Sequence, residues 1–318
     1  MSKADRVELV EVAPRDGFQV VKALIPTETK LAVVDALAAT GIGRIEIGAF
    51  VSPKAIPQMA DIGEVLARAH LPDGVRTQVL VPNAKGAEMA LAHGVKEIVW
   101  VVSVSESHNR SNVRRSHSES MRDFAAAWPV FAAQGAKLRF NLATCFDCPF
   151  EGRIAEGDVR RAIETVLATT RDVEIGICDT TGRAATDHVE RLCRGVVGDY
   201  GGGPTTFAFH GHDTYALGVA NAFAAFSAGI AVIDGAAAGL GGCPFAPGAS
   251  GNTATEDLVF AFEHRGVATG VDLAKLLAAA DLAYDCAPND ASGRLRSVPR
   301  ERALAGFGAG TRGIPLAR

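Results

Sequence analysis

The chain has 318 residues, of which 48% are hydrophobic, and a formal net charge of −4 at pH 7. This length and apolar content suffice for one large core, either in a single α/β barrel or in two smaller domains. The slight acidity excludes the basic surface that binding to nucleic acid or to an anionic membrane requires. No apolar run reaches the roughly 18–20 residues of a membrane span, so we expect neither a nucleic-acid partner nor a membrane.

The N-terminal residues Met1–Asp5 have no targeting-signal character, and six cysteines do not form a disulfide framework in a chain this long. We therefore expect a cytoplasmic protein with reduced thiols.

Apolar runs of strand length alternate with segments of helical periodicity along most of the chain. The predicted strands are Val7–Pro14, Arg44–Phe50, Arg76–Val81, Glu97–Val104, Lys137–Thr144, Val173–Cys178, Thr205–His212 and a run that begins at Ala231–Ile233. The predicted helices are Pro26–Leu37, Ile62–Ala69, Ala84–Ala92, Glu119–Ala133, Glu156–Ala168, Thr186–Val197, Leu217–Ala228 and Thr255–Glu263. About eight strand–helix alternations predict an α/β fold of the TIM (β/α)₈ barrel type.

The segments between the predicted strands and helices, and those after them, complete the predicted domain organisation. Residues 105–117 read as a polar loop, and Pro129 is expected to kink or end the helix that contains it. We expect a single domain over residues 1–318, with the barrel at about 7–265 and a helical C-terminal extension at about 266–318. A doubly wound open sheet is the alternative, because strand order cannot be read from one sequence. No glycine-rich phosphate loop opens a helix, which counts against a nucleotide-binding open sheet.

The strand Thr205–His212 carries histidines at positions 210 and 212, and in an extended strand this spacing places both imidazoles on one face. A bare H-x-H is more often two ordinary polar residues. Here, however, polar residues also end other strands, and the C-terminal strand ends of a barrel converge on one face. These residues are Arg15, Asp16, Glu46, Arg139, Asn141, Asp179, Cys243 and Asn252. A mixed set of nitrogen and oxygen donors suits Mg²⁺, Mn²⁺ or Co²⁺ better than a structural zinc.

Four groups of residues carry a resemblance to a known family. They are Val10–Gly17, Phe50–Lys54 with Pro57–Met59, His210–Tyr215, and Gly239–Asn252 with Thr255–Asp257. Together they resemble 3-hydroxy-3-methylglutaryl-CoA (HMG-CoA) lyases, which belong to the metal-dependent aldolase-type barrels together with isopropylmalate and homocitrate synthases. The resemblance covers about residues 7–285. Its R-D-G and H-x-H-D pieces are shared across the superfamily, whereas the G-L-G-G-C-P and F-V-S-P-K pieces are more specific to the lyases.

The resemblance implies a role for each matching residue. It implies a divalent metal ion, Mg²⁺ or Mn²⁺, with the ligands Asp16, His210, His212 and Asn252. It implies a catalytic set made up of Arg15, Asp16, Glu46, Asp179, His210 and Cys243. In that set Arg15 stabilises a thioester enolate, and Cys243 takes part in proton transfer from a mobile loop. The residues expected to bind substrate are Arg15, Asn112, Arg139 and Asn141. The basic segment 108–115 suits either the CoA phosphates or a solvated loop.

The implied reaction is the cleavage of HMG-CoA, or of a related branched 3-hydroxyacyl-CoA, to acetyl-CoA and acetoacetate or the corresponding 3-keto acid. The implied assembly is a homodimer. Ala49 and Gly176 stand where the family has serines, and Asn141 stands where it has a tyrosine, so the acyl group remains open. An isopropylmalate synthase-like condensing enzyme and a biotin-dependent carboxyltransferase barrel remain alternatives.

Overall fold

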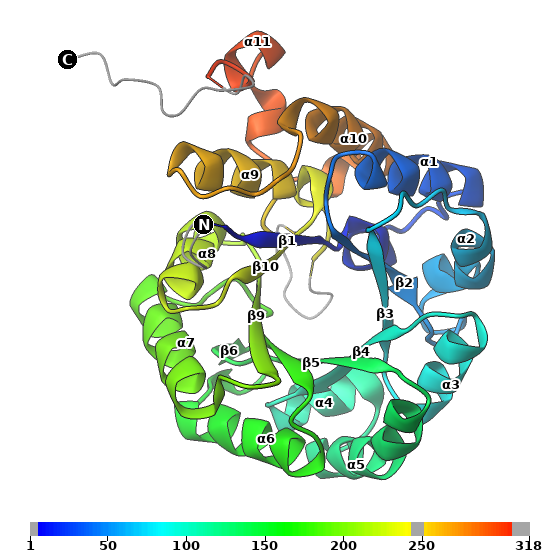
Figure 1. Ribbon diagram of the computed structural model, residues 1–318, viewed down its shortest axis with the longest axis vertical. Coiled ribbons are helices and arrows are strands. Elements are labelled where there is room, and N and C mark those ends of the chain that lie inside the picture. The colour runs from blue at the N-terminus through cyan, green and yellow to red at the C-terminus, as the bar shows by residue number, and fades with distance from the viewer. Residues whose placement is uncertain (1–5, 243–250, 307–318) are drawn as a thin grey trace.

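The computed structural model describes residues 6–242 and 251–306, and eight of its strands close into a parallel barrel (Figure 1). These strands are β1 (Glu8–Glu11), β2 (Arg44–Ala49), β3 (Arg76–Val81), β4 (Glu97–Ser103), β5 (Lys137–Ala143), β8 (Val173–Asp179), β9 (Thr205–Gly211) and β10 (Val232–Gly235). The order around the barrel is β1-β10-β9-β8-β5-β4-β3-β2, and β1 pairs with both β2 and β10. The predicted TIM barrel is therefore confirmed, and the open sheet was the wrong alternative.

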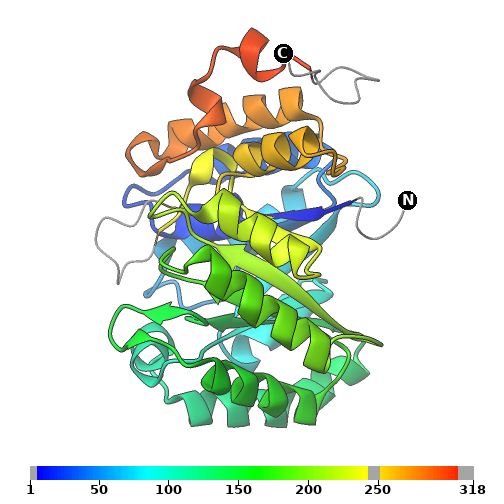
Figure 2. The ribbon, with the colours of Figure 1, turned by 90° about the vertical axis from the view of Figure 1, so that its left-hand side faces the viewer.

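Helices surround the barrel on its outside (Figure 1). They are α1 (Thr27–Ala38), α2 (Ile62–Arg68), α3 (Ala84–Ala92), α4 (Glu106–Val113), α5 (His117–Ala133), α6 (Glu156–Thr169), α7 (Thr186–Tyr200), α8 (Gly218–Ser227) and α9 (Thr255–His264). The further helix α10 (Leu273–Cys286) packs against both α1 and α9, and the short α11 (Arg300–Ala303) follows it. Figure 2 shows these last helices together at one side of the barrel.

Two details of the sequence prediction were wrong. Residues 105–117 contain α4, whose first turn is capped by Ser105, because the Ser105 Oγ accepts from the His108 N–H. The helix also depends on the buried Asn109, which donates to the Ser120 Oγ at 2.9 Å and accepts from the Ser103 N–H. In addition, Pro129 does not end α5, which runs to Ala133 as predicted, so of the two effects expected of Pro129 the helix end is wrong.

Strand β5 shows how a strand of this barrel divides its side chains between the surrounding helices and the barrel interior. Along it, apolar and polar residues alternate, so its two faces differ. Phe140 contacts Phe124 of α5 with ring centroids 4.7 Å apart, so the apolar face lies against the helices. Arg139 reaches Asp234 of β10, which is not a neighbour of β5, so the polar face lies inside the barrel.

Ion pairs cross the interior of the barrel. Arg44 of β2 donates from Nη1 to Glu174 of β8 at 2.7 Å, and its guanidinium also lies 2.8 Å from Glu8 of β1. Branched apolar side chains usually dominate the interior of such barrels, whereas here Arg44 and Arg139 are buried there. Removing one partner of a buried pair leaves the other charge unpaired in a low-dielectric environment, so each pair is structurally sensitive.

Arg44→Ala should therefore lower the free energy of unfolding by about 3 kcal/mol, because the half-buried Glu174 loses its closest cation and keeps only Arg139 at 3.6 Å. The matched control is Arg68→Ala, which removes the exposed ion pairs with Glu28 and Glu64 and should cost less than about 1 kcal/mol. Urea unfolding of both variants measures the difference. Equal losses of unfolding free energy in the two variants would show that the interior pair contributes no more to stability than the exposed pairs.

Candidate metal centre

A single π-helical turn, η2 (Ala13–Gly17), follows β1 directly and was not foreseen from the sequence. Its turn is closed by the N–H groups of Asp16 and Gly17, which both donate to the Val12 carbonyl. Pro14 lies near its start, where a missing backbone N–H costs no hydrogen bond. The turn places Arg15 and Asp16 at the carboxyl end of the barrel, and both are buried.

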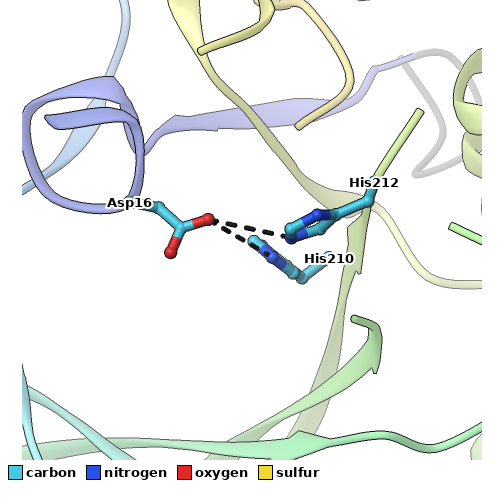
Figure 3. A group of neighbouring side chains, drawn as sticks. All are labelled: Asp16, His210 and His212. Carbon is cyan, nitrogen blue, oxygen red and sulfur yellow. Dashed lines mark ion pairs between the residues drawn. The ribbon is translucent and has the colours of Figure 1, made fainter. Parts of the chain in front are cut away.

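Asp16 faces the two histidines of β9 and its continuation (Figure 3). Its Oδ2 lies 3.9 Å from the Nε2 of His210 and 3.8 Å from the Nε2 of His212. One donor atom from each of these residues lies within 4.8 Å of the others, and all three side chains are buried. Three converging donors at this spacing can share one cation. The predicted H-x-H pair and Asp16 are thus brought together.

Asn252 completes the set of four predicted ligands. Its Nδ2 donates to the Asp16 Oδ2 at 2.8 Å and to the Leu240 carbonyl at 2.9 Å, which fixes the orientation of the amide. Its Oδ1 is buried and has no hydrogen-bond partner within the described residues. A buried oxygen without a partner is costly unless something else binds it. The residues therefore fit a divalent cation that prefers oxygen and imidazole ligands.

Two backbone features hold Asn252 in place. It forms an isolated antiparallel bridge with His212, so the two side chains are positioned by the same backbone contact. Gly241 approaches it closely at a φ of +122°, and a Cβ there would lie 2.3 Å from the Asn252 Nδ2. Only glycine combines that backbone conformation with that space. Cys243, the predicted loop cysteine, lies outside the described residues.

Arg15 links the metal centre to a second carboxylate. Its guanidinium donates to the Asp16 Oδ1 from Nη1 and to the Glu46 Oε1 from Nε. Gln78 of β3 donates to the other oxygen of Glu46 at 2.8 Å. Burial alone would raise the pKa of Asp16, but the charge of Arg15 and then of the two histidines lowers it to about 2. Asp16 is therefore ionised and available as a ligand at any ordinary pH.

Asp179 lies at the end of β8, beside the metal centre, because its carbonyl accepts from the His212 N–H at 3.3 Å. Its Oδ2 accepts from the Ala184 N–H at 3.1 Å, whereas its Oδ1 is buried and has no hydrogen-bond partner in the described parts of the chain. Burial raises the pKa of Asp179 to about 6. A carboxyl group with this pKa can exchange a proton near neutral pH.

Arg139 and Asn141 lie inside the barrel, and Arg139 joins them to the metal centre. The Arg139 Nε donates to the Asn141 Oδ1 at 2.9 Å, and its Nη2 donates to Asp234, which in turn contacts His210. Burial alone would raise the pKa of Asp234, but Arg139 and then His210 hold it below its usual value. Asn112 is exposed on α4, and the structure records no contact between it and the metal centre.

Two buried glutamates were missed by the sequence analysis. Glu11 accepts from the N–H groups of Ala13 and Ala237 and from the Thr255 hydroxyl, so it ties η2 to the loop after β10 and to α9. Glu256 accepts from the Ala238 N–H at 3.1 Å. Burial raises the pKa of Glu11 to about 7 and that of Glu256 to about 8. The available signals were that Glu11 ends an apolar strand and that both glutamates lie within segments that carry the family resemblance.

The raised pKa of Glu256 predicts a pH dependence of stability. The unfolded chain loses this proton near the ordinary pKa of 4.5, whereas the folded chain keeps it up to about pH 8. The free energy of unfolding should therefore fall as the pH rises through this window, by up to about 1.4 kcal/mol per pH unit from this group. Glu256→Gln should flatten that decline, which urea unfolding at several pH values measures. Parallel curves for wild type and variant would contradict the assignment.

The chain is similar to known proteins along most of its length. The family model described as HMGL-like matches residues 6–283. The mitochondrial hydroxymethylglutaryl-CoA lyase of Mus musculus is 40% identical over 276 residues, which are 87% of this chain and 84% of that protein. The (R)-citramalyl-CoA lyase of Chloroflexus aurantiacus is 38% identical over 287 residues, covering 87% of this chain and 90% of that protein.

A solved structure is similar along its whole length. It is an HMG-CoA lyase from Acinetobacter baumannii in complex with coenzyme A and 3-methylmalate, with a TM-score of 0.85, 34% identity and 100% coverage of both chains. Among the described residues, no helix combines the length and the apolar character needed to cross a membrane.

Proposed function

This chain belongs to the HMGL-like family and is a lyase, and we propose that it cleaves a carbon–carbon bond in a branched 3-hydroxyacyl-CoA with the help of a divalent cation. HMG-CoA is the first candidate substrate, with acetyl-CoA and acetoacetate as products. The two relatives named above are lyases, which favours cleavage over the condensation catalysed by synthases of the wider superfamily.

The arrangement of Asp16, His210, His212 and Asn252 is the observation that carries this proposal. Together they offer two imidazole nitrogens and two oxygens at the carboxyl end of the barrel, where catalytic groups of this fold collect. Mg²⁺ or Mn²⁺ bound there would act as a Lewis acid that lowers the pKa of the substrate's 3-hydroxyl group.

Arg15 supplies the second requirement of the reaction. When the bond between C2 and C3 breaks, its electron pair moves onto the thioester, and negative charge develops on the thioester oxygen. A guanidinium is always charged and presents several N–H donors, so Arg15 can stabilise that oxygen. Its buried contacts with Asp16 and Glu46 hold it in position before the reaction begins.

Proton transfers complete the proposed reaction. A base takes the proton of the 3-hydroxyl group, which becomes the ketone of the released keto acid. The enolate carbon then takes up a proton to give acetyl-CoA, so no oxidant or reductant is needed. Asp179, whose pKa burial raises to about 6, is the candidate for the base. Cys243 remains the predicted proton donor to the enolate carbon.

A second candidate substrate is the shorter citramalyl-CoA, whose acid group is attached directly to C3. One observation favours it: a citramalyl-CoA lyase is almost as similar to this chain as the mouse HMG-CoA lyase. It also agrees with the sequence expectation that Ala49, Asn141 and Gly176 depart from the pattern of the HMG-CoA lyases. At the interior wall of the barrel Asn141 occupies the space above Gly176, since a Cβ on residue 176 would lie 2.0 Å from the Asn141 Oδ1. Asn141 and Gly176 therefore depend on each other sterically: the side chain at position 141 leaves no room for one at position 176.

Other expectations remain proposals. We propose that Asn112 on α4, which is exposed, and the neighbouring basic residues meet the coenzyme A part of the substrate. A cytoplasmic location and a homodimer stay predictions from the sequence.

The first test is release of acetyl-CoA from HMG-CoA and from citramalyl-CoA, each with Mg²⁺ or Mn²⁺ and again after chelation. We expect turnover of at least one substrate at about 1 s⁻¹ or faster, and its loss on chelation. Turnover that persists in the metal-free protein would refute the metal-dependent mechanism. Folded, metal-loaded protein that cleaves neither compound would refute both candidate substrates.

A double-mutant cycle tests the coupling at the wall. Gly176→Ser alone should lower the free energy of unfolding by about 1–3 kcal/mol, because the new side chain meets Asn141. In an Asn141→Ala background most of that loss should disappear. The double variant should also change the ratio of kcat/KM between the two substrates. Additive losses of stability in urea unfolding would show that the two positions are independent.

A further inference from the structure

The geometry assigns to Asp234 a positioning role: it holds the imidazole of His210 so that the Nε2 lone pair is presented to the cation. This inference rests on the proposed metal site and goes beyond it, because Asp234 is not one of the four ligands. Asp234 lies on β10, which pairs with the strand that carries His210, and the two side chains meet inside the barrel.

The first step of the argument is the hydrogen bond between them. The Nδ1 of His210 lies 3.0 Å from the Asp234 Oδ2, whereas its Nε2 faces Asp16. An ionised carboxylate only accepts hydrogen bonds, so Nδ1 must carry the proton of this contact. In the neutral ring Nε2 is then the unprotonated nitrogen, which is the form that binds a metal ion.

The second step is a contrast with the other histidine. The Nδ1 of His212 is buried, yet it has no hydrogen-bond partner anywhere in residues 6–242 and 251–306. His212 therefore has no comparable contact to select its tautomer. Of the two imidazoles at the centre, His210 is the one whose tautomer is selected by a carboxylate.

The third step explains how the charge of Asp234 is kept inside the barrel. The side chain is 2% exposed, and its Oδ1 has no hydrogen-bond partner among the described residues. Its Oδ2 also accepts from the Arg139 Nη2 at 2.7 Å. Arg139 is in turn held by Asn141, which accepts from its Nε at 2.9 Å, so the guanidinium that balances the charge of Asp234 is itself fixed in place.

The test measures Mn²⁺ binding to the metal-free full-length protein by the EPR signal of free Mn²⁺. Asp234→Asn should weaken binding roughly 10- to 100-fold, because the amide can donate to Nδ1 as well as accept from it and no longer selects one tautomer. The matched control is Glu174→Gln, because Glu174 is a half-buried carboxylate that lies 3.6 Å from Arg139 but does not contact His210. Its Mn²⁺ affinity should stay close to that of the wild type. Unchanged affinity in Asp234→Asn, or an equal loss in both variants, would overturn the inference.

A second measurement requires no change at Asp234. The ¹⁵N spectrum of histidine-labelled, metal-free wild type at mildly alkaline pH should show His210 with Nδ1 protonated and Nε2 bare, with His210→Gln identifying the signal. A bare Nδ1 would overturn the role of Asp234 even if Mn²⁺ binds. If the wild type binds no Mn²⁺, the proposed metal site fails, and with it the positioning of a ligand, whatever the tautomer.

Discussion

Charged side chains inside a closed barrel must be paired there. This requirement shapes the interior from the amino ends of the strands, here called the base, to their carboxyl ends, here called the mouth. Near the base, Arg44 bridges Glu8 and Glu174. Farther along, Arg139 joins Glu174 to Asp234. At the mouth, Arg15 plays the same part between carboxylates of η2 and β2. Every arginine in this series touches more than one carboxylate, so none of the strands that carry these residues can shift without breaking contacts on others.

The carboxyl groups around the metal centre fall into two classes according to what faces them. Asp16 lies against a guanidinium and two imidazoles, and its pKa is about 2. Asp179 and Glu11 are buried against backbone N–H groups, which compensate burial less fully than a cation does, and their pKa values are raised to about 6 and 7. Asp16 thus stays ionised at any ordinary pH, whereas Asp179 can exchange a proton near neutral pH. The two roles require the two different environments.

The sequence predicted the barrel and the side chains at its strand ends because those features are local, whereas the ligand roles of Asp16 and Asn252 were implied by the family resemblance. Strand alternation, the two-residue spacing of His210 and His212, and the acidic turn after β1 can each be seen in a short window. Asp234 could not be recognised, because its importance comes from Arg139 and His210 on other strands. Helix α4 was missed for a different reason: its residues are polar throughout, so hydrophobic periodicity gives no signal, and its cap and the contacts of Asn109 stabilise it.

The interior pairs also constrain how the chain can reach this structure. Arg44 and Glu174 are 130 positions apart, on strands that belong to different halves of the chain. A fragment with only the first few strand–helix units would keep Glu8 beside Arg44 but would lack Glu174, and the complementary fragment would leave Glu174 without its closest cation. Neither half forms the complete set of interior contacts, so partial assembly gains less stability than closure of the whole barrel. Long-range closure of this kind is entropically slow, and it makes folding of the two halves a single cooperative event.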